Sequence, residues 1–220
     1  MDGDSGESGL VHRIETRLRQ MIVGGELRDS AKLRQDHIAA EFGATAAPVR
    51  EALRRLENAR LVVSRPRRGV VVAPIAPGDA LEVAEMRASL ESLALRLALP
   101  ESSESDAAAA SSAIERVNHS ADIGEWLTAN RDFHLALYRP CRKARLLDAI
   151  QDLWLASDRH LYRVWASLDY KSTSQEEHRA ILATYTRRDA EAAAALLARH
   201  ILEAGKALET LLRQTEEPDA

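Results

Sequence analysis

Four polar residues in the second half of the chain are spaced so that they could bind one metal ion. Asn130 and His134 lie four positions apart, so a helix would place both on one face. His178 and His200 are 22 residues apart, and a turn near residue 189 would fold their two helices antiparallel, with both side chains facing inward. Neutral imidazole is the commonest metal ligand in proteins, but scattered histidines are also common as capping or core-edge residues. The spacing alone leaves both interpretations open.

A second group of chemically active residues consists of arginines. Residues 50–68 contain seven of them, at positions 50, 54, 55, 60, 65, 67 and 68, against Glu51 and Glu57. The chain has a net charge of −4, yet residues 10–76 hold 13 Lys/Arg and 7 Asp/Glu, whereas residues 77–220 hold 17 and 24. An arginine cluster can be a solvated helix face or a phosphate-binding surface. A basic segment joined to an acidic one indicates two modules with different partners.

Composition limits the class of protein that carries these residues. The 220 residues are 45% hydrophobic, 29% charged and 4% aromatic, which favours a mainly α fold over a sheet-rich one. The single cysteine, Cys141, excludes an internal disulfide framework and an all-cysteine zinc site. No apolar run reaches the ~18–20 residues that span a bilayer, and the first residues are acidic rather than basic and then apolar. We therefore expect a cytoplasmic protein that does not enter a membrane.

The basic segment predicts a winged helix-turn-helix over residues 10–76, preceded by a disordered tail over residues 1–9. Apolar spacing indicates helices over 10–23 and 33–43, with Gly43 as the turn that ends the second. Thr45 can cap a third helix, and Pro48 fits its first turn. Two β-branched runs, 61–65 and 70–73, flank a short Arg/Gly turn and predict a hairpin.

The acidic segment, residues 77–220, reads only as helices and predicts an all-α antiparallel bundle. The expected helices cover 80–99, 105–119, 122–138, 144–168, 174–187 and 189–214. We expect structural roles for His119 and His160. Trp154, Tyr162 and Trp165 are expected in the core or at a dimer interface.

Residues 48–54 read Pro-Val-Arg-Glu-Ala-Leu-Arg, and they are followed by Leu61-Val62 and by Arg67-Arg68-Gly69-Val70. These segments resemble the recognition helix and wing of GntR-type bacterial transcription regulators. The helical remainder resembles the FCD ligand-binding domain of the FadR subfamily, in its six-helix, VanR-like variant. The resemblance covers nearly all of residues 10–213. It implies that the third helix enters the major groove and that the wing arginines reach phosphates or the minor groove.

The resemblance also implies which residues contact DNA. By resemblance these are Thr45, Arg50, Arg68 and Gly69, and charge alone adds Arg54 and Arg67. One departure is that the family usually has Ser-Arg where this chain has Thr45-Ala46, so a guanidinium contact worth ~1–3 kcal/mol is missing. Another family contact position, often Arg, is here Asp36. A carboxylate near phosphates is unfavourable, and we expect Arg34 to compensate.

For the histidines, the resemblance implies a metal site. Metal-binding FCD domains have an Asp, then a Phe-His pair whose His is four residues on, then one His on each of the last two helices. His134, His178 and His200 match this pattern, with Asn130 at the usual Asp position. Three imidazoles suit Zn²⁺ or Ni²⁺ better than Mg²⁺ or Ca²⁺. The alternative is a metal-free pocket whose histidines bond an anion directly.

Arg87 matches an arginine that FCD domains aim into their cavity, which implies a small organic acid as effector, held by the metal and by the guanidinium fork. The alternative is a surface salt bridge between Arg87 and Glu91.

The expected function is that of a homodimeric transcription regulator, a repressor of a palindromic operator controlled by that effector. A metal-dependent hydrolase using the three histidines lacks an evident general base and leaves the basic module unexplained. An architectural DNA binder leaves the acidic domain without a role.

Overall fold

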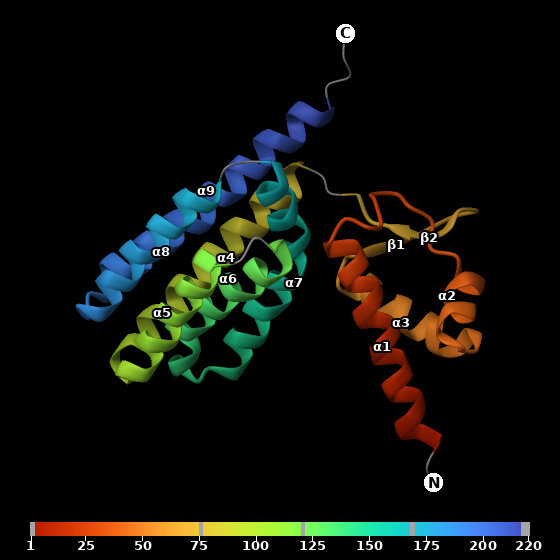
Figure 1. Cartoon of the computed structure of the whole chain (residues 1–220), viewed down its shortest axis with the longest axis horizontal. Coiled ribbons are helices and arrows are strands. Elements are labelled where there is room, and N and C mark those ends of the chain that lie inside the picture. The colour runs from red at the N-terminus through yellow and green to blue at the C-terminus, as the bar shows by residue number, and fades with distance from the viewer. Residues whose placement is uncertain (1–2, 75–76, 120–121, 168–169, 217–220) are drawn as a thin grey trace. The chain divides into compact units, whose positions relative to one another are not determined.

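The structure, a computed structural model, describes residues 3–74, 77–119, 122–167 and 170–216 (Figure 1). Within these ranges the side chains of residues 3–7, 77, 119, 155–156, 158–167, 170–171 and 215–216 are not described. The expected roles of His119, His160, Tyr162 and Trp165 therefore lie outside the described side chains. The chain divides into two compact units, residues 1–75 and residues 76–220, and each is considered by itself.

The first unit has three helices and a two-stranded sheet in its described part. These are α1 (Gly3–Val23), α2 (Gln35–Phe42), α3 (Ala46–Asn58), β1 (Val62–Arg65) and β2 (Gly69–Val72). Its core is formed where the apolar stripe of α1, including Ile14 and Leu18, packs against Val49, Leu53 and Leu56 of α3. The order of helices followed by an antiparallel hairpin is that of a winged helix-turn-helix.

Three local features of this unit differ from expectation. Helix α1 begins at Gly3, inside the stretch for which a disordered tail was predicted. Thr45 occupies the N-cap position of α3, but its side chain makes no capping hydrogen bond. The second helix was expected from residue 33, but α2 begins at Gln35. The segment before it pairs with the wing: the Leu33 amide donates to the Val70 carbonyl at 2.9 Å, and Lys32 is bridged to Val71. Gly43 ends α2 as expected, with φ +58.

The second unit is helical throughout its described part. It consists of α4 (Pro77–Ala98), α5 (Glu104–His119), α6 (Ile123–Tyr138), α7 (Ala144–Ser167), α8 (Tyr170–Thr186) and α9 (Ala190–Glu216), with short 3-10 turns at Leu99–Glu101 and Arg139–Cys141. The predicted all-helical class is confirmed. Asp122 caps α6 as expected, because its side chain accepts from the Gly124 amide at 2.8 Å.

Two features of the second unit fix the position of α9, which carries His200. A tight turn between α8 and α9, with Arg188 at φ +62, lets these two helices lie side by side (Figure 1). Helices α4 and α9 approach closely, since a Cβ on Gly205 would overlap the Cβ of Ala84.

In the described part of the chain, no helix is long and apolar enough to cross a membrane.

Candidate DNA-binding surface and candidate histidine site

Helix α3 presents one apolar and one basic face. Val49 and Leu53 are buried, whereas Thr45, Arg50 and Arg54 are exposed. Arg50 has no acidic partner among the residues that the structure describes. Ala46 and Ala47 at the start of α3 are exposed as well, so within the first unit the exposed face of α3 extends from Thr45 to Arg54.

The wing carries the second group of basic residues. Arg65 pairs with Gly69 across the hairpin, so the turn consists of three residues that end with Arg67 and Arg68. Arg67 has φ +62 and Gly69 φ +75, both in the left-handed region, where glycine carries no Cβ penalty. Arg67, Arg68 and Gly69 are all exposed. The tip of the wing is therefore a compact cationic projection.

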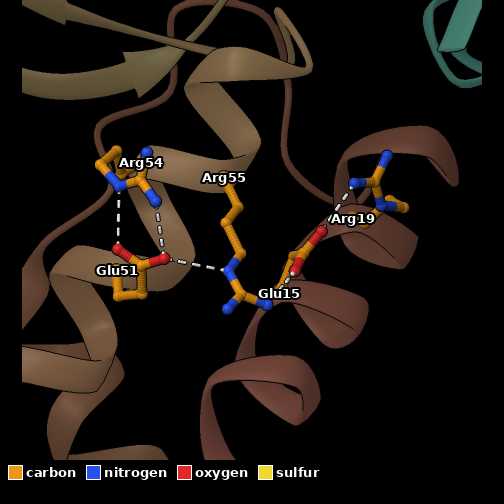
Figure 2. Close-up of polar contacts among 5 residues, drawn as sticks. All are labelled: Glu15, Arg19, Glu51, Arg54 and Arg55. Atoms are coloured by element: carbon orange, nitrogen blue, oxygen red, sulfur yellow. Dashed lines mark hydrogen bonds and ion pairs between the residues drawn. The ribbon is translucent and has the colours of Figure 1, made fainter. Parts of the chain in front are cut away.

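Two of the predicted DNA-contacting arginines already hold a carboxylate. Arg34 bonds Asp36 through Nε at 3.3 Å and Nη2 at 2.7 Å. Arg54 bonds Glu51 through Nε and Nη2, each at 2.8 Å (Figure 2). Hydrogen bonds from the arginines lower the pKa of Asp36 and of Glu51 to about 2. The expectation that Arg34 compensates Asp36 thus corresponds to a direct ion pair between them.

The three predicted histidines come together in the core of the second unit. His134 lies on α6, His178 on α8 and His200 on α9, and each is at most 5% exposed. One ring nitrogen from each lies within 4.8 Å of the others. The Nε2 atoms of His178 and His200 are 3.2 Å apart. Two nitrogens bound to a tetrahedral zinc at about 2.0–2.1 Å would be separated by about 3.3 Å.

The other nitrogen of each ring, Nδ1, faces an oxygen acceptor. His134 Nδ1 lies 2.8 Å from Glu91 Oε2, and His200 Nδ1 lies 2.7 Å from Glu177 Oε2. His178 Nδ1 lies 3.2 Å from Oε1 of Gln175, whose amide nitrogen donates to the carbonyl of residue 114 and so fixes the orientation of the amide. These acceptors place the proton on Nδ1 of each ring and leave each Nε2 with a lone pair.

Three lone pairs that face one point in the protein interior favour a cation there. The Nε2 of His134 is buried without a hydrogen-bond partner among the described residues, and the same holds for Oδ1 of Asn130, four residues earlier on α6. Two Nε2 lone pairs 3.2 Å apart repel each other unless a proton or a metal ion lies between them. Acceptors behind ligating histidines are the usual second layer of a metal site. The donor set therefore fits a borderline divalent ion.

Burial favours the neutral state of His134 and His178, which metal binding requires. Desolvation is the largest cause that lowers the pKa of His134 and of His178 well below the usual value, and the neighbouring His200 lowers both further. Desolvation also raises the pKa of Glu91, although Arg87 opposes that shift. Neutral imidazole can bind a metal, whereas imidazolium cannot.

Arg87 lies beside this site in a buried network. Its Nε donates to Glu91 Oε1 at 2.7 Å, and the two side chains are 6% and 0% exposed. The pair that was considered as a surface salt bridge therefore exists, but it is buried. The guanidinium carbon lies 3.6 Å from the centre of the Trp154 ring, and Nη2 is buried without a hydrogen-bond partner among the described residues. Arg87 thus offers one unused donor close to the histidines.

Sequence reasoning missed the residues that position the histidines. Gln175 and Glu177 were not assigned a role, and Glu91 was considered only as the partner of Arg87 in a surface salt bridge. Trp154 was assigned to the core or a dimer interface without its contact to Arg87. The available signals were the four-residue spacing of Arg87 and Glu91 and the short spacing of Gln175 and Glu177 to His178. None of these spacings says which face of a helix is buried.

A winged helix-turn-helix with exposed arginines on its third helix and wing, joined in sequence to a helical bundle that encloses histidines and an arginine, has the architecture of a DNA-binding protein. Residues 10–72 match the bacterial regulatory proteins of the gntR family, and residues 82–203 match the FCD domain. The chain belongs to the GntR family of transcription regulators, with a C-terminal FCD domain. It is a DNA-binding transcription regulator and not an enzyme.

Individual relatives are similar over most of their length. The uncharacterized HTH-type transcriptional regulator BphR of Paraburkholderia xenovorans is 30% identical over 203 residues, which cover 87% of this chain and 82% of the relative. The repressor GlaR of Escherichia coli is 26% identical over 196 residues, covering 84% and 89%. The solved structure of E. coli McbR/YncC has a TM-score of 0.78 at 23% identity, covering 94% of this chain and 99% of that one, and supports the fold alone. A GntR family member from Pseudomonas syringae has a TM-score of 0.60 at 33% identity, covering 94% and 87%.

Proposed function

We propose that the protein is a repressor that binds a palindromic operator through residues 10–76 and is controlled by an effector bound within residues 77–220. The proposal for the DNA side rests on the exposed Arg50 and on the cationic wing tip. Contacts to bases and phosphates would come from Thr45, Arg50, Arg67, Arg68 and Gly69. Arg34 and Arg54 would contribute only where a phosphate replaces their carboxylate. Repressors among the relatives, such as GlaR, support the direction of control.

The DNA assignment is tested by selection from a library of duplexes with a randomised centre. Wild-type protein should enrich a short inverted repeat. Arg50→Ala should weaken binding to the enriched duplex at least tenfold at fixed salt, because it removes a charged contact in the major groove. Arg13→Ala, at an exposed position of α1, is the matched control. Equal affinity of wild-type and Arg50→Ala protein would rule out α3 as the recognition helix.

We infer that the second unit also forms a homodimer. Three large apolar side chains of α4, Met86, Leu93 and Leu97, are 46%, 45% and 41% exposed. Spacings of seven and four residues place them on one face of the helix, and a second copy of the chain would cover them. A dimer presents two recognition helices related by a twofold axis, as a palindrome requires. Light scattering should give about twice the 24.3 kDa of one chain, and Leu93→Glu should shift the protein towards monomer.

We further infer that His134, His178 and His200, with Asn130, hold one divalent ion, with zinc or nickel the best match to three imidazoles. When bound, such an ion supplies a Lewis-acidic point that can take a carboxylate oxygen of the effector. The buried Nη2 of Arg87 supplies a second anchor for the same carboxylate. The observation that carries this inference is the set of Nε2 atoms whose lone pairs face one point. The chain would act in the bacterial cytoplasm, on the nucleoid when bound to DNA.

The metal assignment is tested by elemental analysis of protein prepared without an affinity tag or chelator. We expect about one ion per chain, lost in His178→Ala and kept in His37→Ala, at an exposed position of the first unit. Added Zn²⁺ at 100 times the dissociation constant should stabilise the second unit by about 2.7 kcal/mol. Well under one ion per chain, together with no stabilisation by Zn²⁺, would instead indicate a metal-free anion pocket in which Arg87 is the main anchor.

A further inference from the structure

Helix α3 carries three arginines, and two of them share one carboxylate. Arg54 bonds Glu51 with both Nε and Nη2 at 2.8 Å, and Nε of Arg55 bonds the same Glu51 at 3.1 Å (Figure 2). The chain of charges continues to α1, because Nη1 of Arg55 lies 3.7 Å from Glu15, which itself bonds Arg19 at 2.9 Å. Positive and negative groups therefore alternate along a line that links α3 to α1.

We propose that Glu51 is a specificity-determining residue, which occupies Arg54 as a phosphate would and so limits the affinity of the recognition helix for DNA of arbitrary sequence. The proposal rests on the DNA-binding function proposed above. A carboxylate and a phosphate bind a guanidinium with the same two-point geometry, and here the Nε and Nη2 edge of Arg54 is already taken. Arg54 is 61% exposed, so a phosphate can reach it, and Glu51 is the competing anion.

The effect of Glu51 on affinity for DNA of arbitrary sequence depends on how nonspecific binding arises. Affinity for arbitrary DNA comes essentially from counterions released when cations meet phosphates. An arginine that exchanges a carboxylate for a phosphate gains little, because the freed Glu51 is left as a negative charge beside the DNA. Arg50, which has no acidic partner in the described part of the chain, keeps its full contribution to base or phosphate contacts. Glu51 therefore lowers nonspecific affinity more than specific affinity.

A second pair in the same unit has the same form. Arg34, which directly precedes α2, bonds Asp36 at 3.3 and 2.7 Å through the same edge of its guanidinium. Both side chains of this pair are more than half exposed. Two of the helices expected to face DNA thus each keep one arginine in a two-point bond with a nearby carboxylate. Asp36 provides an independent position at which the proposal can be tested.

The test measures binding of the full chain to a fluorescent duplex of scrambled sequence by anisotropy, between 50 and 200 mM KCl. One additional phosphate contact makes the slope of log K against log[salt] steeper by about 0.9. We expect Glu51→Gln to steepen the slope by about that amount and to raise affinity several-fold at 50 mM. Asp36→Asn, which frees Arg34, should do the same. The double substitution Glu51→Gln with Arg54→Ala should lose the gain.

The matched control is Glu57→Gln on the same helix. Among the described residues Glu57 pairs with no arginine side chain, and it accepts from the Ser64 amide at 2.8 Å, a bond that Gln can keep. This variant therefore removes one negative charge without freeing a cation. If Glu51→Gln and Glu57→Gln have the same slope and affinity, the proposal is wrong and only net charge matters. If wild-type protein does not bind duplex DNA at any salt concentration, the proposed function itself fails. Melting temperatures identify variants that do not fold, and Asp36→Asn then decides.

Discussion

Asn130 is the residue at which the proposed metal site can be tested most directly, by replacing it with aspartate. Its side chain is 3% exposed and its Oδ1 is buried without a hydrogen-bond partner among the described residues. Asn130→Asp changes one atom in a nearly isosteric side chain and adds a negative charge. Without metal that charge is buried in the protein interior, whereas with metal it becomes a ligand stronger than an amide oxygen. The substitution should therefore make folding more dependent on metal.

The cost in the metal-free protein has an upper bound. A buried carboxylate can avoid its desolvation penalty by taking up a proton, and moving its pKa from 3.9 to above 7 costs about 4 kcal/mol at pH 7. A neighbouring imidazole can take the proton instead, because a buried carboxylate beside it favours the imidazolium form and so opposes the effect of desolvation on its pKa. We expect a loss of between about 1 and 4 kcal/mol in the free energy of unfolding. With metal, each tenfold gain in affinity recovers about 1.4 kcal/mol.

All three tryptophans, at positions 126, 154 and 165, lie in the second unit, so urea unfolding followed by tryptophan fluorescence reports on that unit. Asn130→Asp should be less stable than wild type in EDTA and should bind Zn²⁺ at least tenfold more tightly. Asn118→Asp makes the same chemical change at an exposed position and is the control. Unchanged stability in EDTA together with unchanged zinc affinity would refute the placement of Asn130 at the site. An equal loss in Asn118→Asp would refute the argument from burial.

Three further outcomes are expected. Burial lowers the pKa of His134 and His178, so below pH 6.5 protons bind the unfolded chain more than the folded one. In EDTA the free energy of unfolding should therefore fall by about 1 kcal/mol per histidine between pH 6.5 and 5.5. Stability independent of pH over this range would contradict the argument. Gly205→Ala should destabilise the second unit by about 1–2 kcal/mol in urea titrations, since overpacking against Ala84 outweighs a gain of about 1 kcal/mol in helix propensity. Adding Ala84→Gly to this variant should restore stability. Ala46→Arg should tighten binding to duplexes of any sequence by anisotropy, because it adds an exposed cation at the start of α3; unchanged affinity would place Ala46 away from DNA.

Much of the fold follows from local patterns in the sequence. The i, i+4, i+7 spacing of Val49, Leu53 and Leu56 predicts both the helix α3 and its buried face, and all three residues are buried. The pairing of residues 31–33 with β2 could not be predicted in the same way. That segment has no alternation of its own, and its hydrogen bonds to Val70 and Val72 depend on where the hairpin folds.

The histidine site was also partly predictable from local spacing in the sequence. The spacing of Asn130 and His134 fixes a shared face, and the turn near Asp189 aligns α8 with α9. The role of Glu91 could not be read, because α4 is apolar on more than one side. Leu95 is buried on this helix while Leu93 is exposed, so periodicity does not say whether the face with Arg87 and Glu91 points inward.

Glu91 is the residue through which the two proposed ligands would influence each other. Its two oxygens bond different partners, Arg87 on one side and His134 on the other. A carboxylate effector on Arg87 would share the guanidinium with Glu91, which would then interact more strongly with His134 and make that ring a better metal ligand. A metal on His134 would in turn draw negative charge from Glu91 and leave Arg87 more open to an external anion. Such coupling is reciprocal by thermodynamic necessity. Both Arg87 and Glu91 lie on α4, which begins at Pro77, five residues after β2 ends at Val72. The helix that carries both groups is therefore the first helix after the wing in the sequence.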